Sequence, residues 1–250
     1  MKTFVQKVFR RLASMGRRPP NISTDYRIIT DSADVRLDGW LAPEVARRQH
    51  RAYAELLEAA REGSPRVDFA VAGEAVRRTG LANPRLLEVG CGSGYYSEVL
   101  PRLAGPMRYV GVDYSVEMVK LARRMYRKEA FVAGDARRLP FADATFEIVV
   151  SGNSLMHIAE YQLAIEENVR VSASWCVFHT VPVIENGSTT FLTKRAYGEP
   201  VVEVVFNRSE LEATFARARL RIEAVFESIP YDVSAVLNER NRTLTYLCRT

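Results

Sequence analysis

The chain contains 250 residues, of which 47% are hydrophobic and 26% are charged. This length and composition allow a packed core and exclude intrinsic disorder, collagen-like repeats and small disulfide-rich scaffolds. The three cysteines, Cys91, Cys176 and Cys248, are far apart and form no CxxC pair, so neither a metal centre nor a disulfide framework is predicted. Together with the lack of a long apolar run or a secretory signal in the sequence, this favours a cytoplasmic protein.

The net charge of +5 is concentrated in a basic arm at residues 1–20. That arm contains six basic residues and no acidic one, whereas the rest of the chain contains 29 basic and 30 acidic residues. The globular part is therefore not the basic surface that nucleic acid requires, and a small-molecule partner is expected. The arm has three open interpretations: an extension, a lid or dimer-contact helix, or a segment for membrane-surface binding or targeting. A homodimer through the N-terminal helices also stays open.

Two helices are predicted in residues 21–83, which would form a helical lid region. The first covers residues 41–63, where Pro43 suits the first turn and apolar residues recur at helical spacing. The second covers residues 65–79, with Ser64 as its N-cap and Gly80 as its end. Residues 1–80 are therefore expected to be mainly helical.

From residue 84 onward, short apolar runs alternate with amphipathic helices, which is typical of a parallel sheet built from βαβ units. Strands are predicted at residues 85–89, 108–112, 130–133, 146–151 and 175–181, with helices at 95–103, 115–127 and 160–171. An insertion at 183–207, with a hairpin at 189–195 and 201–206, would cover the substrate. A helix capped by Ser209 follows, and strands at 221–227 and 243–248 would pair antiparallel. The predicted class is α/β, with a doubly wound, mostly parallel seven-stranded sheet and an antiparallel last strand.

The segment from Leu86 to Tyr96, LLEVGCGSGYY, combines an apolar strand, three alternating glycines and a helix start. Glycines at such a turn let the backbone approach a ligand, and free N–H groups at the helix start can bind acceptor atoms. Tyr95 stands where a dinucleotide fingerprint has its third glycine. An NAD-dependent dehydrogenase is therefore disfavoured.

Asp113 follows the next predicted strand, about 20 residues after the glycine loop. A carboxylate at this edge of the sheet can accept hydrogen bonds from both hydroxyls of a ribose. Alternatively, Asp113 only caps the helix that begins near Ser115. Because Glu88, the glycines and Asp113 occur together, the ribose interpretation is favoured.

Two further segments complete the pattern: GDARRLPF at residues 134–141 and TFEIVVSGN at residues 145–153. With them, residues 84–182 resemble a class I S-adenosylmethionine-dependent methyltransferase of the small-molecule type. The resemblance implies a Rossmann-like fold, S-adenosyl-L-methionine as cofactor and S-adenosyl-L-homocysteine as product. The chain departs from the family at two positions: Glu147 stands where Asp is usual, and Met156 precedes His157 where a second His is frequent.

The resemblance also implies a set of residues for each part of the cofactor. These are Glu88, Gly90, Gly92 and Gly94 for the methionine part, Asp113 for the ribose, Tyr114, Met118, Asp135 and Ala136 for the adenine, and Ser151 beneath the methionine end.

A general base is needed only if the methyl acceptor must first lose a proton. His157 is the first candidate because it follows the fourth strand, at the edge where such sheets bind ligands. His179, near the end of the fifth strand, is a weaker candidate. Each histidine could instead have a purely structural role.

The substrate pocket is expected between the N-terminal helices and the insertion. Its predicted wall residues are Tyr26, Trp40, Gln49, Tyr53, Tyr95, Lys194, Arg195 and Tyr197. Aromatic residues at helical spacing are more often core residues than substrate contacts. If Lys194 and Arg195 both faced the pocket, an anionic substrate would follow.

The sequence therefore predicts a methyltransferase that acts on an O, N or C atom of a small molecule by in-line displacement. Three alternatives stay open: an RNA or protein methyltransferase that uses the basic arm, a non-catalytic S-adenosylmethionine-binding partner subunit, and an enzyme with other chemistry on the same fold. Residues 151–156 read SGNSLM and lack the Asn/Asp-Pro-Pro-aromatic pattern of base amino methylases, and no Pro-Cys nucleophile occurs.

Overall fold

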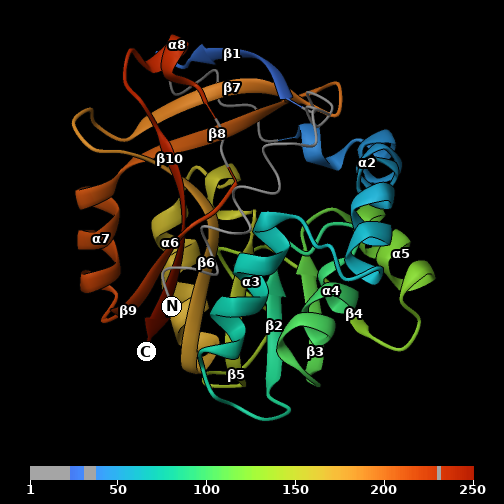
Figure 1. Ribbon diagram of the computed structural model, residues 1–250. Helices are drawn as coiled ribbons and strands as arrows, with labels where there is room; N and C mark the ends of the chain where they lie inside the picture. Colours follow the sequence, from blue (N-terminus) through green and yellow to red (C-terminus); the bar gives the residue numbers. More distant parts are fainter. Residues whose placement is uncertain (1–22, 31–37, 230–231) are drawn as a thin grey trace.

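A central sheet with helices on both faces and a smaller sheet above one of its ends make up the fold (Figure 1). The computed structural model describes residues 23–30, 38–229 and 232–250. The basic arm predicted at residues 1–20 lies outside the described residues, so its interpretations stay predictions. In the described ranges, no helix is both long and apolar enough to cross a membrane.

The central sheet contains seven described strands, and its order matches a doubly wound topology. The order is β4 (Ala130–Ala133), β3 (Arg108–Asp113), β2 (Arg85–Val89), β5 (Phe146–Gly152), β6 (Ser172–Ile184), β10 (Arg242–Arg249) and β9 (Arg221–Glu227). Strands β2 to β6 pair in parallel, whereas β10 is antiparallel to both β6 and β9. The predicted mostly parallel sheet with an antiparallel last strand is therefore confirmed.

Helices cover both faces of this sheet because its strands carry apolar side chains on both sides. On one face, Leu86 and Val177 belong to a core with α3 (Val67–Arg77), α4 (Tyr96–Ala104) and α5 (Val116–Met125). On the other face, Leu87 and Cys176 belong to a core with α6 (Tyr161–Val171) and α7 (Arg208–Arg217). Neighbouring residues of one strand thus pack on opposite faces, as the two-residue period of a strand requires.

The smaller sheet is built on an extension of β6, which is 13 residues long. The end of β6 pairs in parallel with the end of β8 (Glu199–Asn207), through Val183 and Phe206. Strand β7 (Thr190–Ala196) is antiparallel to β8, and β1 (Ser23–Ile28) is antiparallel to β7. The hairpin predicted in the insertion is therefore present, and it lies above the ends of the central strands (Figure 1).

Strand β1 differs from the prediction that the N-terminal region is mainly helical. Its partner residues come from β7, with Ser23 opposite Ala196. An edge strand that pairs with a hairpin so distant in sequence has little local signal, because the ladder that stabilises it forms only in the fold.

The two predicted N-terminal helices are present as α2 (Pro43–Arg61) and α3. Two predicted N-caps are wrong: Ser64 for α3 and Ser209 for α7. Helix α3 begins after Arg66 without a side-chain cap, so Ser64 does not cap it. Helix α7 is capped by Asn207, whose side-chain oxygen accepts a hydrogen bond from the Glu210 N–H at 3.1 Å. Three short elements were not predicted: η2 (Gly39–Leu41), η3 (Leu155–His157) and α8 (Ser234–Leu237).

Candidate active site

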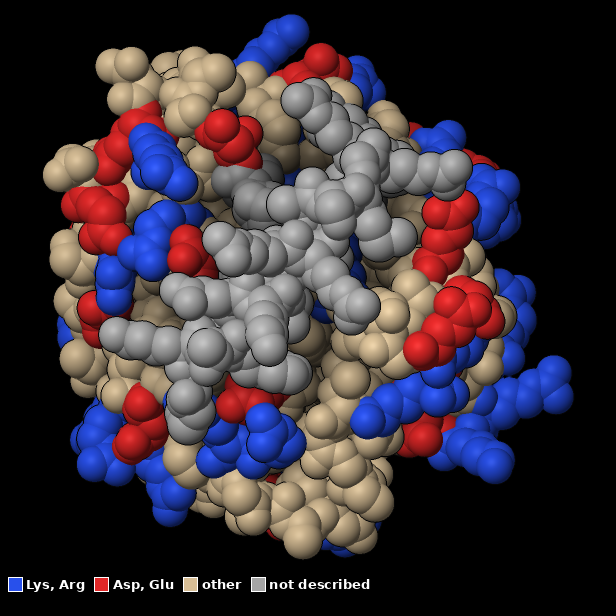
Figure 2. Space-filling view, in the orientation of Figure 1, with Lys and Arg blue, Asp and Glu red and all other residues tan. Residues whose placement is uncertain are grey.

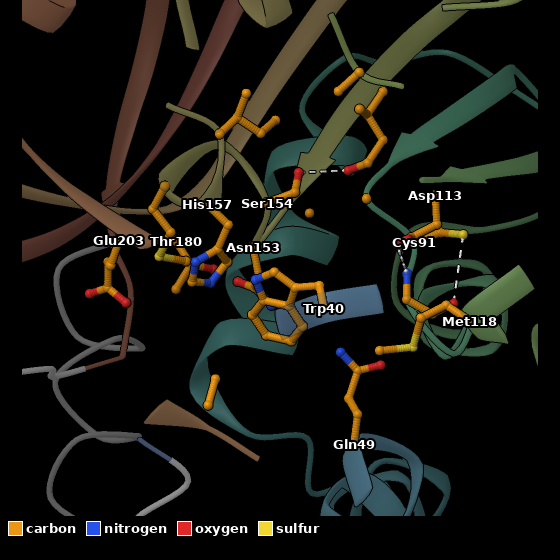
Figure 3. Close-up of a pocket in the computed structure, with 18 of the residues that line it drawn as sticks. Trp40, Gln49, Cys91, Asp113, Met118, Asn153, Ser154, His157, Thr180 and Glu203 are labelled. Carbon is orange, nitrogen blue, oxygen red and sulfur yellow. Dashed lines mark hydrogen bonds between the residues drawn. The ribbon is translucent and has the colours of Figure 1, made fainter. Parts of the chain in front are cut away.

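A cavity of about 410 Å³ lies at the carboxyl ends of the central strands, beneath η2, α2 and the β7–β8 hairpin (Figure 3). Doubly wound sheets bind ligands at this edge. We divide the cavity into two halves. The loop half is lined by Gly90, Cys91, Gly92, Asp113, Tyr114, Met118, Gly134, Asp135 and Ala136. The lid half is lined by Tyr26, Trp40, Tyr53, Arg66, Asp68, Tyr95, Asn153, His157, Thr180, Lys194, Tyr197, Glu203 and Thr243.

The glycine loop brings backbone groups to the loop half, where it also contacts helix α2. Gly90 and Gly92 line the cavity with positive φ angles of 74° and 52°. A Cβ on Gly92 would lie 2.6 Å from Gln49 Oε1 of α2, so a side chain at this position would push the end of Gln49 away from the loop, and the positive φ would strain any residue other than glycine. Gln49 Oε1 also accepts a hydrogen bond from the Ser93 N–H at 3.0 Å. Gln49, a predicted wall residue, therefore connects α2 directly to the glycine loop.

Gly94 does not line the cavity and instead allows close packing beneath the loop. A Cβ on Gly94 would lie 2.8 Å from the Phe131 ring of β4 and 2.9 Å from Ala122 of α5. The close packing that a dinucleotide fingerprint obtains from its third glycine is therefore supplied here by Gly94, one residue before Tyr95. Gly94 thus has a packing role in this structure, and its implied role beside the methionine part stays a prediction.

Asp113, at the end of β3, lies beside the glycine loop and lines the cavity. Its carboxylate accepts hydrogen bonds from the Gly92 N–H at 2.8 Å and the Ser115 N–H at 2.9 Å. Burial raises the pKa of Asp113 to about 6, although both backbone hydrogen bonds oppose this shift. The residue thus supports the start of α5, as the capping interpretation expects, and also presents a carboxylate to the loop half.

Glu88 and Ser151, two of the implied cofactor residues, do not line the cavity. Glu88 is 1% exposed and accepts a hydrogen bond from the Tyr109 hydroxyl of β3. Burial raises its pKa well above the ordinary value. Ser151 is 1% exposed, and its hydroxyl lies 2.9 Å from that of Ser154, which does line the cavity. Glu88 therefore contacts β3 and Ser151 contacts a residue that lines the cavity, and their implied cofactor roles stay predictions.

The four residues implied for the adenine all line the loop half. Met118 of α5 is buried, Tyr114 is partly exposed, and Asp135 and Ala136 follow β4. The Asp135 carboxylate is held by the Arg137 guanidinium at 2.6 Å, and this pairing lowers its pKa. Arg137 also contacts Glu160 at 3.0 Å, which joins this loop to the start of α6.

His157 reaches the cavity from η3, beside Trp40. The two ring centroids are 4.8 Å apart, and Figure 3 shows the rings next to each other. His157 Nδ1 lies 2.7 Å from the Val202 carbonyl oxygen, so Nδ1 carries the proton and Nε2 is an acceptor. Burial and the nearby Lys194 cation lower the pKa of His157 to about 3, against the opposing hydrogen bond to Val202. The neutral imidazole suits accepting a hydrogen bond better than removing a proton.

His179 is not placed in the cavity, and we correct its predicted role to a structural one. It is 1% exposed, and both ring nitrogens have partners: Nε2 with the Tyr96 hydroxyl at 2.9 Å and Nδ1 with the Thr245 hydroxyl at 2.8 Å. Burial lowers its pKa to about 4. The side chain therefore ties α4 to β6 and β10.

The predicted aromatic wall residues all line the lid half: Tyr26, Trp40, Tyr53, Tyr95 and Tyr197. Tyr53 stacks on Tyr95 with centroids 4.3 Å apart and planes 20° apart. Trp40 meets Tyr197 edge-on at 6.0 Å. Rings from β1, η2, α2, the residue before α4 and the hairpin thus line one space.

Lys194 and Arg195 lie on opposite sides of β7, so only Lys194 lines the cavity. Lys194 pairs with Glu203 of β8, and the two residues are 7% and 0% exposed. Burial lowers the pKa of Lys194 to about 7, and the adjacent carboxylate favours its charged form. Arg195 contacts Asp25 at 3.6 Å outside the cavity. The condition for inferring an anionic substrate, that both cations face the site, is therefore not met.

Sequence reasoning missed several polar lining residues. Three of their buried side-chain atoms have no hydrogen-bond partner: Asn153 Oδ1, Thr180 Oγ1 and Thr243 Oγ1. The same holds for Nε1 of Trp40, a predicted wall residue. Asn153 was within a quoted motif and follows β5 directly, which could have pointed to it. Thr180, Thr243 and Glu203 carry no local signal. Among the described residues, no group of His, Cys, Asp and Glu is arranged to hold a metal ion.

Comparison with known proteins matches the central part of the chain to a recognised sequence family. Residues 87–175 match the family described as "Methyltransferase domain". The demethylmenaquinone methyltransferase of Roseiflexus sp. (strain RS-1) is 36% identical over 90 residues, which is 35% of this chain and 38% of that protein. The matched segment therefore spans well under half the length of this curated relative.

Two solved structures resemble most of the chain. The 1,6-didemethyltoxoflavin-N1-methyltransferase of Burkholderia thailandensis, with bound 1,6-didemethyltoxoflavin and S-adenosylhomocysteine, is 17% identical, with a TM-score of 0.55 and coverage of 84% of this chain and 90% of its own. The magnesium protoporphyrin IX methyltransferase of Synechocystis PCC 6803, with bound SAM, is 14% identical, with a TM-score of 0.58 and coverage of 85% and 93%. At these identities, the likeness shows a shared fold. Residues 87–175 are therefore a methyltransferase domain with the Rossmann-like fold of the class I S-adenosylmethionine-dependent methyltransferases.

Proposed function

We propose that the protein is an S-adenosyl-L-methionine-dependent methyltransferase that methylates an oxygen, nitrogen or carbon atom of a small molecule. The observation that carries this proposal is the continuity of the cavity, which joins Asp113 and the glycine loop to an aromatic lid half. A methyl donor in the loop half and an acceptor in the lid half would share one enclosed space. Direct transfer between them requires such an arrangement.

The residues of the loop half suit this cofactor. The Asp113 carboxylate uses only part of its acceptor capacity on the Gly92 and Ser115 N–H groups, so it can also accept hydrogen bonds from ribose hydroxyls. Tyr114 and Met118 offer apolar surface to a flat base. Asn153 Oδ1, buried and without a partner, can accept a hydrogen bond from an amino group at the methionine end.

When bound, S-adenosyl-L-methionine supplies a methyl group activated by the positive charge on its sulfur. The chain's own contribution is to orient the acceptor in line with that methyl group and to exclude water. Tyr53 and Tyr95 close one wall of the lid half, and Gln49 closes the cavity over the glycine loop. In this proposal, catalysis depends mainly on positioning.

His157 orients the acceptor in this proposal and does not act as a strong base. Its Nδ1 proton is committed to the Val202 carbonyl oxygen, which leaves Nε2 to accept a hydrogen bond from an O–H or N–H of the acceptor. With a pKa near 3, the imidazole holds a proton weakly at neutral pH. Methyl transfer to an already nucleophilic atom fits this site best.

An RNA or protein acceptor is the alternative that the basic arm suggested. On the face seen in Figure 2, blue basic and red acidic side chains are interspersed around the described surface. A phosphate backbone is bound by a concentration of basic charge, which such a mixed surface does not offer. The charge pattern of this face therefore favours the small-molecule proposal.

Calorimetric titration with S-adenosyl-L-homocysteine tests the proposal. We expect micromolar binding by the wild-type protein and binding about 10- to 100-fold weaker by Asp113→Ala, because charged hydrogen bonds are lost. Asp143→Ala is the matched control, because the side chain of Asp143 is 78% exposed and pairs with Arg170 outside the cavity. If neither the wild type nor the control binds, the domain shares the fold without the proposed cofactor.

A further inference from the structure

We propose that the methyl acceptor is an uncharged, ring-containing molecule with polar substituents, and that the Lys194–Glu203 pair makes the lid half select against anions. This inference rests on the proposed function, because it takes the lid half as the acceptor site. Three independent features of the described residues support it: the shape of the walls, the unpartnered polar atoms and the pairing of charges.

The walls of the lid half suit a flat ring. Trp40 and His157 present tilted rings with centroids 4.8 Å apart, and Tyr197 borders Trp40. The stacked pair Tyr53 and Tyr95 forms a further wall. Aromatic side chains interact with a ring by offset stacking and edge-on contact, which adds to the burial of apolar surface.

Unpartnered polar atoms show where substituents of the ring would bind. Thr180 and Thr243 are 5% and 4% exposed, and their hydroxyls have no partner. They lie on the paired strands β6 and β10, where Thr243 is opposite Pro182. The indole N–H of Trp40 also lacks a partner and can only donate. Buried polar groups are almost always hydrogen-bonded, so a carbonyl, hydroxyl or ring nitrogen of the acceptor is the fitting partner.

The charged residues that line the lid half are arranged in opposite pairs. Lys194 pairs with Glu203, and Arg66 contacts Asp68 at 2.5 Å. Asp68 and Glu203 are both 0% exposed. A carboxylate that entered beside Lys194 would also face the buried Glu203 carboxylate, and the repulsion of like charges in a low-dielectric site would oppose its binding. An uncharged acceptor avoids this cost.

Three probes that share one ring system test whether the lid half prefers neutral rings to anionic ones. The probes are 2-naphthol and 2-acetonaphthone, which are neutral, and 2-naphthoate, which is an anion. Each is titrated by calorimetry into the full chain saturated with S-adenosyl-L-homocysteine. We expect both neutral probes to bind at least about tenfold more tightly than 2-naphthoate.

Two charge variants then test the ion pair. Glu203→Gln leaves the Lys194 cation without its carboxylate, so 2-naphthoate should gain at least about tenfold in affinity relative to 2-naphthol. The double variant Lys194→Met with Glu203→Leu keeps the wall uncharged and should retain the preference for neutral probes. Because buried ion pairs can often be replaced by apolar residues, this double variant also provides a test if Glu203→Gln fails to fold.

A threonine variant tests the polar contacts. Thr243→Val should weaken binding of 2-acetonaphthone by about three- to tenfold through the loss of one hydrogen bond. Thr193→Val is the matched control, because Thr193 precedes Lys194 on β7 and does not line the cavity. Equal effects of the two substitutions would contradict the proposed role of Thr243.

The outcomes separate this inference from the proposed function. If S-adenosyl-L-homocysteine binds but 2-naphthoate equals or exceeds the neutral probes, or if no probe binds at millimolar concentration, the inference is overturned and the cofactor proposal stands. If S-adenosyl-L-homocysteine does not bind, the proposed function fails. The same probe titrations on the protein alone then decide whether the lid half accepts neutral rings.

Discussion

Asp113 should make binding of S-adenosyl-L-homocysteine depend on pH. The residue is 8% exposed, and burial raises the pKa of its carboxyl from 3.8 to about 6. Ribose hydroxyls need the charged carboxylate, because a protonated carboxyl has lost acceptor capacity. The binding form is therefore dominant above pH 6 and is lost as the pH falls through this value.

The size of the effect follows from the ionised fraction. With a pKa of about 6, roughly one tenth of Asp113 is charged at pH 5 and nearly all of it at pH 8. The dissociation constant should therefore be about tenfold larger at pH 5, which corresponds to about 1.4 kcal/mol. The raised pKa also means that the protonated carboxyl stabilises the fold below pH 3.8, and this contribution is lost as the pH rises through about 6.

Calorimetric titrations at pH 5, 6, 7 and 8 measure this dependence. Asp113→Asn cannot titrate and should bind weakly with little pH dependence, whereas Asp143→Asn should behave as the wild type does. A wild-type dissociation constant that changes less than twofold across the range would refute the reasoning. An equal pH dependence in Asp113→Asn would assign the titration to another group.

Three further predictions concern the loop, the histidine and a buried ion pair. Gly92→Ala should weaken S-adenosyl-L-homocysteine binding at least about tenfold in calorimetry, because its Cβ would lie 2.6 Å from Gln49 Oε1 and would push Gln49 away from the glycine loop. Gly63 also has a positive φ, but a Cβ there would have nothing within 4 Å, so Gly63→Ala should leave binding unchanged. His157 should show no protonation between pH 5 and pH 8 in imidazole NMR spectra, since its pKa is lowered to about 3, and a midpoint above 5 would contradict this. Arg66→Met should lower the free energy of unfolding by about 3–5 kcal/mol in urea, because Asp68 is left buried without its partner, and a loss below about 1 kcal/mol would argue against a strong pair.

The central sheet could be predicted because each of its strands is encoded locally. The bounds of β2 and β9 agree with the sequence prediction residue for residue, since continuous or alternating apolar runs between breaks are strong strand signals. Strand β1 had no comparable signal, because its pairing depends on a hairpin that lies more than 160 residues later in the sequence. The error thus lies where a distant partner supplies the stabilising contacts.

The two histidine candidates show why the site was predicted only in part. Sequence position placed His157 and His179 near the ligand-binding edge, but it could not decide which way each side chain points. In β6, His179 turns toward Tyr96 and Thr245, whereas Thr180, at a positive φ of 61°, lines the cavity. An irregular pairing between β6 and β10 lies next to these residues, and such irregularities change which face a side chain occupies.

The central sheet, the glycine loop and the position of Asp113 at a strand end were predictable from the amino-acid sequence, because they depend on local periodicity and on contiguous motifs. In contrast, the contact of Gln49 with the loop, the pairing of Glu203 with Lys194 and the positions of Thr180 and Thr243 in the lid half arise from the folded chain. Each of these contacts joins segments distant in the chain. Burial and charge pairing arise only when such segments pack together, so the chemistry of the lid half could not be predicted from local patterns.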